Sequence, residues 1–148
     1  MLFESIVIAS DHAGFEIKKE LIKYLKEKKI SVKDLGTYSK DKVDYPDYAH
    51  LLAKAVESKE FPIGISICGT GNGINMTVNK HAGIRSALCW NEEIARLARF
   101  HNDSNICALP GRFISREEAI KIVTAFISTG FEGGRHLRRI EKIPIKNQ

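Results

Sequence analysis

The chain has 148 residues, of which 43% are apolar and 28% charged, a composition typical of ordinary globular proteins that excludes a mainly disordered chain. Its 23 basic and 18 acidic residues give a net charge of +5 near pH 7, which suits anionic partners such as phosphates or nucleic acid. We expect a single cytoplasmic domain over residues 1–148, because no stretch has the ~20 apolar residues of a membrane span and the N-terminus lacks the basic region of a signal peptide.

Five short apolar runs alternate with segments of helical periodicity. The runs occupy residues 4–9, 30–35, 63–68, 84–89 and 105–109. Runs that are apolar throughout are typical of parallel strands buried on both faces. The helices are marked by apolar residues at three- and four-residue spacing: Ile17, Leu21 and Leu25; Ala49, Leu52, Ala53 and Val56 after Pro46; Ile94, Leu97, Ala98 and His101; and Ala119, Ile122, Val123 and Phe126. The alternation predicts an α/β fold, a doubly wound, Rossmann-like three-layer sandwich around a five-stranded parallel sheet.

Local signals refine the helices. Most lysines near the start of the chain are interpreted as a solvated helix face: Lys18, Lys19, Lys23 and Lys26. Ser115 and Glu118 form a capping box before the last periodic segment, and Gly130 is predicted to follow its C-terminal cap.

A doubly wound sheet places its ligands outside the carboxyl ends of the strands. The segments predicted to form the site are therefore Ser10–Gly14 after the first strand, Cys68–Gly73 after the third and Pro110–Arg112 after the fifth. Asn102 and its neighbours, just before the fifth strand, are grouped with them.

The most informative segment is Cys68-Gly69-Thr70-Gly71-Asn72-Gly73. Three alternate glycines between a strand and a helix let several amide groups point at one spot, where they would hold a phosphate or a developing oxyanion. A thiol beside such a positive site favours the thiolate form. The alternative is a tight turn with an inert cysteine. A dinucleotide loop is disfavoured, because Ile74 stands where the third glycine of that motif is required.

Other polar residues have both a functional and a structural interpretation. Asp11 and His12 would hold sugar and phosphate, although Asp11 alone is better explained as a helix cap. His101 would act as an acid or base near neutral pH, although a lone histidine on an apolar helix face is more often a core residue. His50 and His81 have no polar companions in the sequence and receive no role.

No metal or other cofactor is expected. Histidines and carboxylates do not show metal-ligand spacing, and the three cysteines, Cys68, Cys89 and Cys107, form neither a C-x-x-C motif nor an even set. They are interpreted as reduced thiols.

The basic cluster near the C-terminus has two interpretations. Arg135 and Arg139 share one helix face with Arg138 alongside, which suits a phosphate. The alternative is a solvated basic tail. Nucleic-acid binding is disfavoured because no recognition motif accompanies the cluster.

Taken together, the motifs resemble the ribose-5-phosphate isomerase B family, which also includes galactose-6-phosphate isomerase subunits. They keep the family's order from about residue 5 to residue 141: residues 10–15, 44–46, 67–74, 79–80, 82–85, 101–103, 111–112 and 131–136. One branch of the family has a glutamate base where this chain has Ile74, so Cys68 places the chain in the cysteine branch. Thr77 and Val78 stand where the family usually has alanine.

The resemblance implies a cofactor-free aldose–ketose isomerase that interconverts ribose 5-phosphate and ribulose 5-phosphate through an enediolate, in the non-oxidative pentose phosphate pathway. The implied catalytic residues are Cys68 as the base, Thr70 at the oxyanion, His101 for opening the sugar ring and Asp11 as its partner. The implied substrate-binding residues are Asp11, His12, Tyr45, Gly69, Thr70, Gly71, Asn72, Gly73, Asn102, Arg112, Arg135 and Arg139.

The resemblance also implies an assembly. The family builds its sites across a homodimer interface, so we expect a homodimer or a dimer of dimers in which residues 131–148, a C-terminal helix and tail, reach the partner subunit. No membrane or nucleic-acid partner is expected. A non-enzymatic sensor of phosphosugars or nucleotides on the same scaffold is the competing hypothesis; it would not need Cys68 and His101 together.

Overall fold

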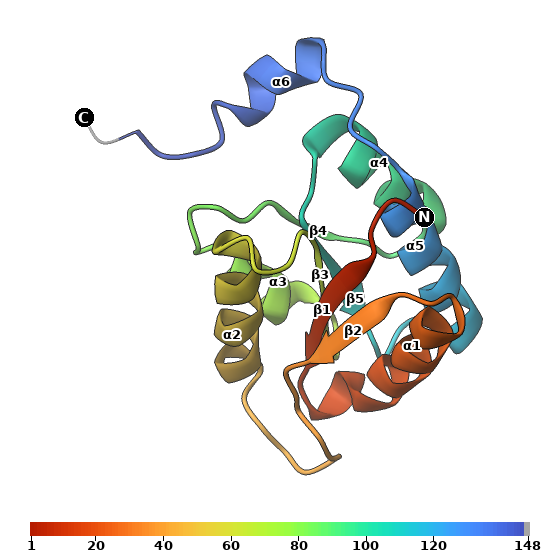
Figure 1. The fold of residues 1–148 in the computed structure, drawn as a ribbon. Helices are drawn as coiled ribbons and strands as arrows, with labels where there is room; N and C mark the ends of the chain where they lie inside the picture. The colour runs from red at the N-terminus through yellow and green to blue at the C-terminus, as the bar shows by residue number, and fades with distance from the viewer. Residues whose placement is uncertain (147–148) are drawn as a thin grey trace.

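The computed structural model describes residues 1–146, which form a five-stranded parallel sheet between two layers of helices (Figure 1). The strands are β1 (Ser5–Ser10), β2 (Ser31–Asp34), β3 (Gly64–Cys68), β4 (Ser86–Leu88) and β5 (Ile106–Pro110). Their order in the sheet is β2-β1-β3-β5-β4, and every neighbouring pair is parallel. The predicted fold class is confirmed. The last two residues of the predicted C-terminal tail, 147 and 148, lie outside the described residues.

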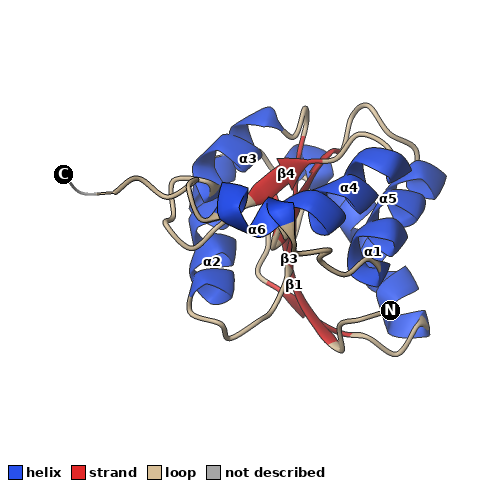
Figure 2. Cartoon of the chain, turned by 90° about the horizontal axis from the view of Figure 1, so that it is seen from above, coloured by secondary structure: helices blue, strands red, loops and turns tan. Residues whose placement is uncertain are grey.

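Helices cover both faces of the sheet, as the view along its edge shows (Figure 2). One face carries η1 (His12–Gly14), α1 (Phe15–Glu27), α4 (Glu92–Asn102) and α5 (Arg116–Ser128). The other carries α2 (Tyr45–Glu57) and α3 (Asn72–Val78). A short last helix, α6 (Arg135–Ile140), stands outside these layers and contacts α4. Within residues 1–146, no helix has the length and apolar character needed to cross a membrane.

The continuous apolar runs are explained by two cores, one on each face of the sheet. Successive side chains of a strand point to opposite faces. In β1, Ile6 and Ile8 join the core shared with α1 and α5, and Val7 and Ala9 join the core shared with α2. Apolar residues at consecutive positions, as in Ile6 to Ala9, are therefore expected where a strand is covered on both faces.

Caps predicted from the sequence are present. Ser115 accepts a hydrogen bond from the amide of Glu118, whose carboxylate accepts one from the amide of Ser115. The helix α5 ends at Ser128 with Thr129 as its cap, so Gly130 occupies the predicted position. The local signals in the sequence therefore predict both ends of α5 correctly.

The interpretation of Lys18 as a solvated residue is wrong, because its side chain is fully buried. Its ammonium lies 2.6 Å from Asp34 Oδ1 and donates a second hydrogen bond to the carbonyl of Thr37. Burial lowers the pKa of Lys18, and the ion pair with Asp34 opposes that shift. Lys19, Lys23 and Lys26 are exposed, as predicted.

We expect Lys18→Ala to destabilise the fold by about 3 kcal/mol, since it removes the buried partner of a part-buried ion pair and leaves a cavity under α1. Lys18→Met should cost less, because it keeps most of the buried volume. Urea unfolding of the two variants and of the matched surface variant Lys19→Ala would measure the difference. A loss below about 1 kcal/mol in Lys18→Ala would show that the pair contributes no more than an exposed one.

Candidate active site

The strand order places a topological switch point, where a ligand crevice is expected, at the carboxyl edge of the sheet. The chain leaves β1 towards β2 on one side and leaves β3 towards β4 on the other, although β1 and β3 are neighbours. Connections that diverge in this way leave room for a ligand between them. The segments Asp11–Gly14 and Gly69–Gly73 flank this crevice, as the sequence predicts.

The glycine-rich loop begins at Cys68, the last residue of β3, whose side chain is only 4% exposed. Gly71 has φ of +75° and a Cβ there would lie 2.4 Å from Leu88 Cδ1, so only glycine fits this position. The amide of Asn72 donates to Thr70 Oγ1 at 3.2 Å. The loop therefore curls around an exposed Thr70 while the thiol stays inside it.

The three cysteines differ in their surroundings. Cys107, in β5, and Cys89, directly after β4, are both fully buried, and burial raises the pKa of the Cys107 thiol well above its ordinary value. Cys107 thus stays protonated and unreactive. Cys68 is the cysteine that stands at the crevice.

The loop after β1 has both a capping and a binding geometry. Asp11 Oδ1 accepts a hydrogen bond from the amide of Gly14 at 3.1 Å, so the interpretation of Asp11 as a cap is confirmed. His12 Nδ1 accepts a hydrogen bond from the amide of Val43 at 3.2 Å. A neutral His12 therefore carries its proton on Nε2 and offers a donor that a phosphate oxygen can accept.

Two further residues approach the glycine-rich loop. The amide of Arg112 donates to the carbonyl of Gly69 at 3.0 Å, and the Arg112 side chain runs along Gly69. The ring of Tyr45 packs so closely on Gly73 that a Cβ there would lie 2.5 Å from it. The carboxyl edge thus brings together most of the predicted residues: Asp11, His12, Tyr45, Cys68, Gly69, Thr70, Gly71, Asn72, Gly73 and Arg112.

The remaining predicted residues lie at the opposite edge of the sheet. A helix that joins parallel strands returns the chain to their amino ends, so α4 ends there with His101 and Asn102. The carbonyl of Asn102 accepts a hydrogen bond from Arg85 Nε, which precedes β4. The grouping of Asn102 with the carboxyl-edge loops is therefore wrong within one chain. Arg135 and Arg139 are exposed on α6, next to α4.

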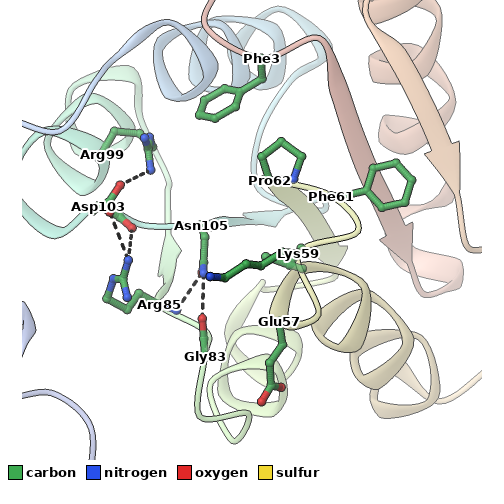
Figure 3. A pocket seen from close by; sticks show the side chains of 11 residues that line it. Phe3, Glu57, Lys59, Phe61, Pro62, Gly83, Arg85, Arg99, Asp103 and Asn105 are labelled. Carbon is green, nitrogen blue, oxygen red and sulfur yellow. Dashed lines mark hydrogen bonds and ion pairs between the residues drawn. The ribbon is translucent and has the colours of Figure 1, made fainter.

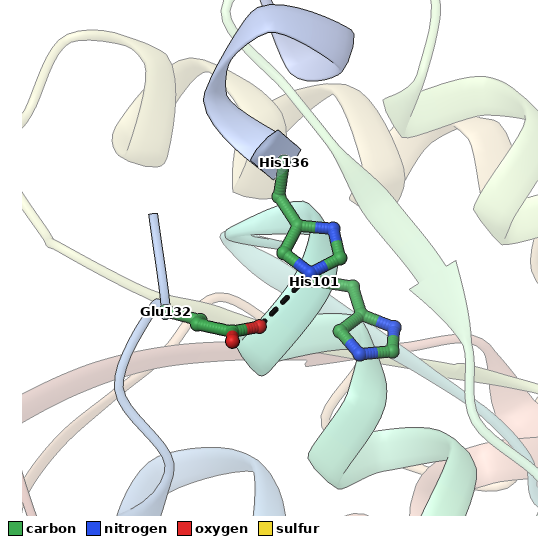
Figure 4. A group of neighbouring side chains, drawn as sticks. All are labelled: His101, Glu132 and His136. Carbon is green, nitrogen blue, oxygen red and sulfur yellow. Dashed lines mark hydrogen bonds and ion pairs between the residues drawn. The ribbon is translucent and has the colours of Figure 1, made fainter. Parts of the chain in front are cut away.

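Figure 4 shows three side chains that meet beside the end of α4. The rings of His101 and His136 are stacked, with centroids 4.4 Å apart and planes 17° apart, and His136 Nε2 lies 2.9 Å from Glu132 Oε2. Their possible metal-ligating atoms all lie within 4.8 Å of one another. Spacing in the sequence missed this group, because His101 is remote from the other two; the four-residue step from Glu132 to His136 was the available signal.

A second histidine group contradicts the sequence analysis. His50 Nδ1 lies 2.8 Å from His81 Nε2, and His81 Nδ1 lies 3.1 Å from Glu57 Oε2. The statement that His50 and His81 lack polar companions is wrong, because the packing of α2 against α3 joins residues that are distant in the sequence.

A cavity of about 360 Å³ also opens at the amino edge (Figure 3). It is lined by Phe3, Val56, Glu57, Lys59, Phe61, Pro62, Gly83, Arg85, Arg99, Asp103 and Asn105. Asp103 pairs with both Arg85 and Arg99, at 3.3 and 2.9 Å. Burial lowers the pKa of Arg99, and Asp103 counteracts that shift. The carboxylate of Asp103 offsets part of the positive charge of Arg85 and Arg99. The cavity is therefore less suited to an anion than its two arginines alone would suggest.

Comparison with known proteins settles the family. The Ribose/Galactose Isomerase family matches residues 6–143. The chain belongs to this family. The resemblance inferred from the sequence motifs is thereby confirmed. Among curated family members, ribose-5-phosphate isomerase B of Escherichia coli is 44% identical over 98% of this chain and 97% of its own length. A probable ribose-5-phosphate isomerase B of Mycoplasma pneumoniae is 49% identical over 93% of this chain and 91% of its own.

Solved structures of family members share the fold. The crystal structure of a ribose 5-phosphate isomerase from Thermotoga maritima superposes with a TM-score of 0.93 at 53% identity and covers 95% of this chain and 97% of that one. Ribose-5-phosphate isomerase B from Mycoplasma genitalium, solved with bound ribulose-5-phosphate, gives a TM-score of 0.90 at 47% identity, covering 94% and 93%.

Proposed function

We propose that the chain is a ribose-5-phosphate isomerase that interconverts D-ribose 5-phosphate and D-ribulose 5-phosphate through an enediolate, as a cytoplasmic enzyme of the non-oxidative pentose phosphate pathway. The relatives named ribose-5-phosphate isomerase B support the reaction. The observation that carries the assignment to this chain is the position of Cys68 and its glycine-rich loop at the sheet crevice, next to Arg112.

Cys68 is the proposed base. Its thiolate takes the proton from C2 of the open aldose, the C2–H electron pair forms the C1–C2 double bond, and the π pair of C1=O1 moves to O1, which gives the enediolate. A proton then passes from the O2 hydroxyl to O1, the O2 electron pair forms the C2=O2 carbonyl, and the C1–C2 pair takes the proton from Cys68 to C1 of the ketose. Thr70 and the amides of Gly69 to Gly73 stabilise the negative oxygen during the transfer. The low exposure of Cys68 supports this role, because a buried base exchanges few protons with water.

Ring opening and phosphate binding are assigned to residues of the other edge: His101 and Asn102, with Arg135 and Arg139. One chain keeps them on the far side of the sheet from Cys68. A two-fold homodimer solves this problem, because each copy then offers the end of α4 and α6 to the crevice of the other. We therefore propose a homodimer, alone or paired into a tetramer, in which the C-terminal segment reaches the partner.

Replacement of Arg139 by alanine is expected to raise KM for ribose 5-phosphate about tenfold and to lower kcat much less, because a bidentate guanidinium–phosphate contact lies remote from the reacting carbons. Arg135→Ala should behave similarly. Steady-state kinetics would measure both, with Arg116→Ala as a control that removes an exposed arginine from α5. An unchanged KM in both variants would remove the phosphate role of α6.

The direct test of the function is ketose formation from ribose 5-phosphate by the purified protein in EDTA. Turnover at a rate of at least about 1 s⁻¹ is expected. Binding of ribose 5-phosphate without turnover, by a folded protein, would contradict the enzymatic proposal and favour a sensor. Salt-dependent retention of RNA with no sugar phosphate binding would contradict both.

A further inference from the structure

We propose that Glu132 and His136 are positioning residues that hold His101 in the orientation needed to open the sugar ring. This inference rests on the proposed function, in which His101 opens the ring. Neither residue has a role in the binding or proton transfers assigned above. The observations behind the proposal are the stacked rings and the hydrogen bond that orients one of them (Figure 4).

The backbone brings the two residues to His101 by contacts with the last turn of α4. Arg99 Nε donates to the carbonyl of Thr129 at 3.2 Å, and the amide of Glu132 donates to the carbonyl of Phe100 at 3.0 Å. Two glycines with positive φ, Gly133 and Gly134, then turn the chain into α6. His136, the second residue of α6, lies over His101. The connection between α5 and α6 therefore determines where the His136 ring lies.

Each of the three side chains holds the next in place. His136 is almost fully buried, and Glu132 Oε2 accepts a hydrogen bond from its Nε2 at 2.9 Å, which fixes the plane of its ring. His101 stacks on that ring at 4.4 Å. Within residues 1–146, no hydrogen bond engages a ring nitrogen of His101. Its orientation therefore depends on packing, and both of its nitrogens stay available to a substrate.

Ring opening needs such an orientation. The proton of the O1 hydroxyl leaves, for which Asp11 is the proposed acceptor, and its electron pair forms the C1=O1 bond. The C1–O4 bond breaks, its pair goes to O4, and His101 supplies the proton that O4 gains. Proton transfer requires the donor nitrogen and the acceptor oxygen to lie about 3 Å apart. An imidazole rotated away from this geometry cannot give its proton to O4.

The same three side chains have the composition of a zinc site. Their geometry favours the hydrogen-bonded stack. Rings that lie 17° from parallel direct their lone pairs side by side and not at a common point, and the Glu132 oxygen already accepts from His136. Loss of activity in EDTA that returns on addition of Zn²⁺ would overturn the positioning role.

The experiment compares ribose 5-phosphate with its C2-deuterated form. His136→Ala should lower kcat about tenfold or more and bring the primary isotope effect towards one, because ring opening, which leaves the C2–H bond intact, becomes rate-limiting. His136→Phe keeps a ring to stack on and should lose less. Glu132→Gln keeps an acceptor for His136 and should retain more activity than Glu132→Ala. The control is Glu141→Gln, a carboxylate beyond the end of α6.

The outcomes separate this inference from the function on which it rests. A wild-type protein without turnover would overturn both. An active wild type whose isotope effect is unchanged in His136→Ala, at normal or reduced kcat, would overturn the positioning role alone. If His136→Ala fails to fold, Glu132→Ala, a change at an exposed position, is used in its place. Its primary isotope effect is likewise expected to move towards one.

Discussion

Replacement of Cys68 by serine is expected to lower kcat by about 10³-fold while leaving the affinity for the sugar phosphate nearly unchanged. A serine hydroxyl fits the space of the thiol but does not ionise near neutral pH, so the C2 proton has no acceptor. The residues proposed to hold the phosphate, His12 on one side and Arg135 and Arg139 on the other, are untouched. The loss should therefore appear in kcat, not in binding.

Coupled kinetics and calorimetric titration with ribose 5-phosphate would measure the two quantities separately. The matched control is Cys89→Ser, which removes a fully buried thiol that packs in the core with α4 and α5 and should keep kcat within about twofold, at a cost in stability of about 1 kcal/mol. Near-normal kcat in Cys68→Ser would show that another group is the base. A joint loss of kcat and binding would instead indicate a collapsed loop.

The fold could be predicted from the sequence because its signals are local. Runs such as residues 63–68 are long enough for a strand and contain no charged residue, which suits a strand covered on both faces. The capping box at Ser115 and Glu118 fixes a helix start with four residues. The burial of Lys18 was missed for the opposite reason: its partners, Asp34 and the carbonyl of Thr37, belong to another strand and the loop after it.

The candidate site divides in the same way. Loops such as Asp11–Gly14 and Gly69–Gly73 could be placed together because all parallel strands end at one edge. His101 could not be placed by that rule, since it ends a returning helix. Glu132 and His136 gave no sufficient signal, because their role is defined by a contact with α4 that only the packed chain makes.

A mixture of two inactive variants, Cys68→Ser and His101→Asn, is expected to recover activity. In the proposed homodimer each site combines the crevice of one copy with the α4 and α6 end of the other. A mixed dimer then has one site with both lesions and one site with none. Random reassortment of equal amounts makes half of the dimers mixed, so the mixture should reach about one quarter of wild-type activity.

The two variants would be unfolded together, refolded and assayed for ketose formation, against each variant treated alone. A second pair, Cys68→Ser with Arg112→Ala, provides the matched control, because both lesions lie at the carboxyl edge and every site of a mixed dimer keeps one of them. Recovery in the first pair and none in the second would place the two halves of the site on different copies. The same recovery in both pairs, or none in either, would contradict a site shared between copies. His101, which lies at the opposite edge of the sheet from Cys68 in one chain, would then need a role other than opening the sugar ring.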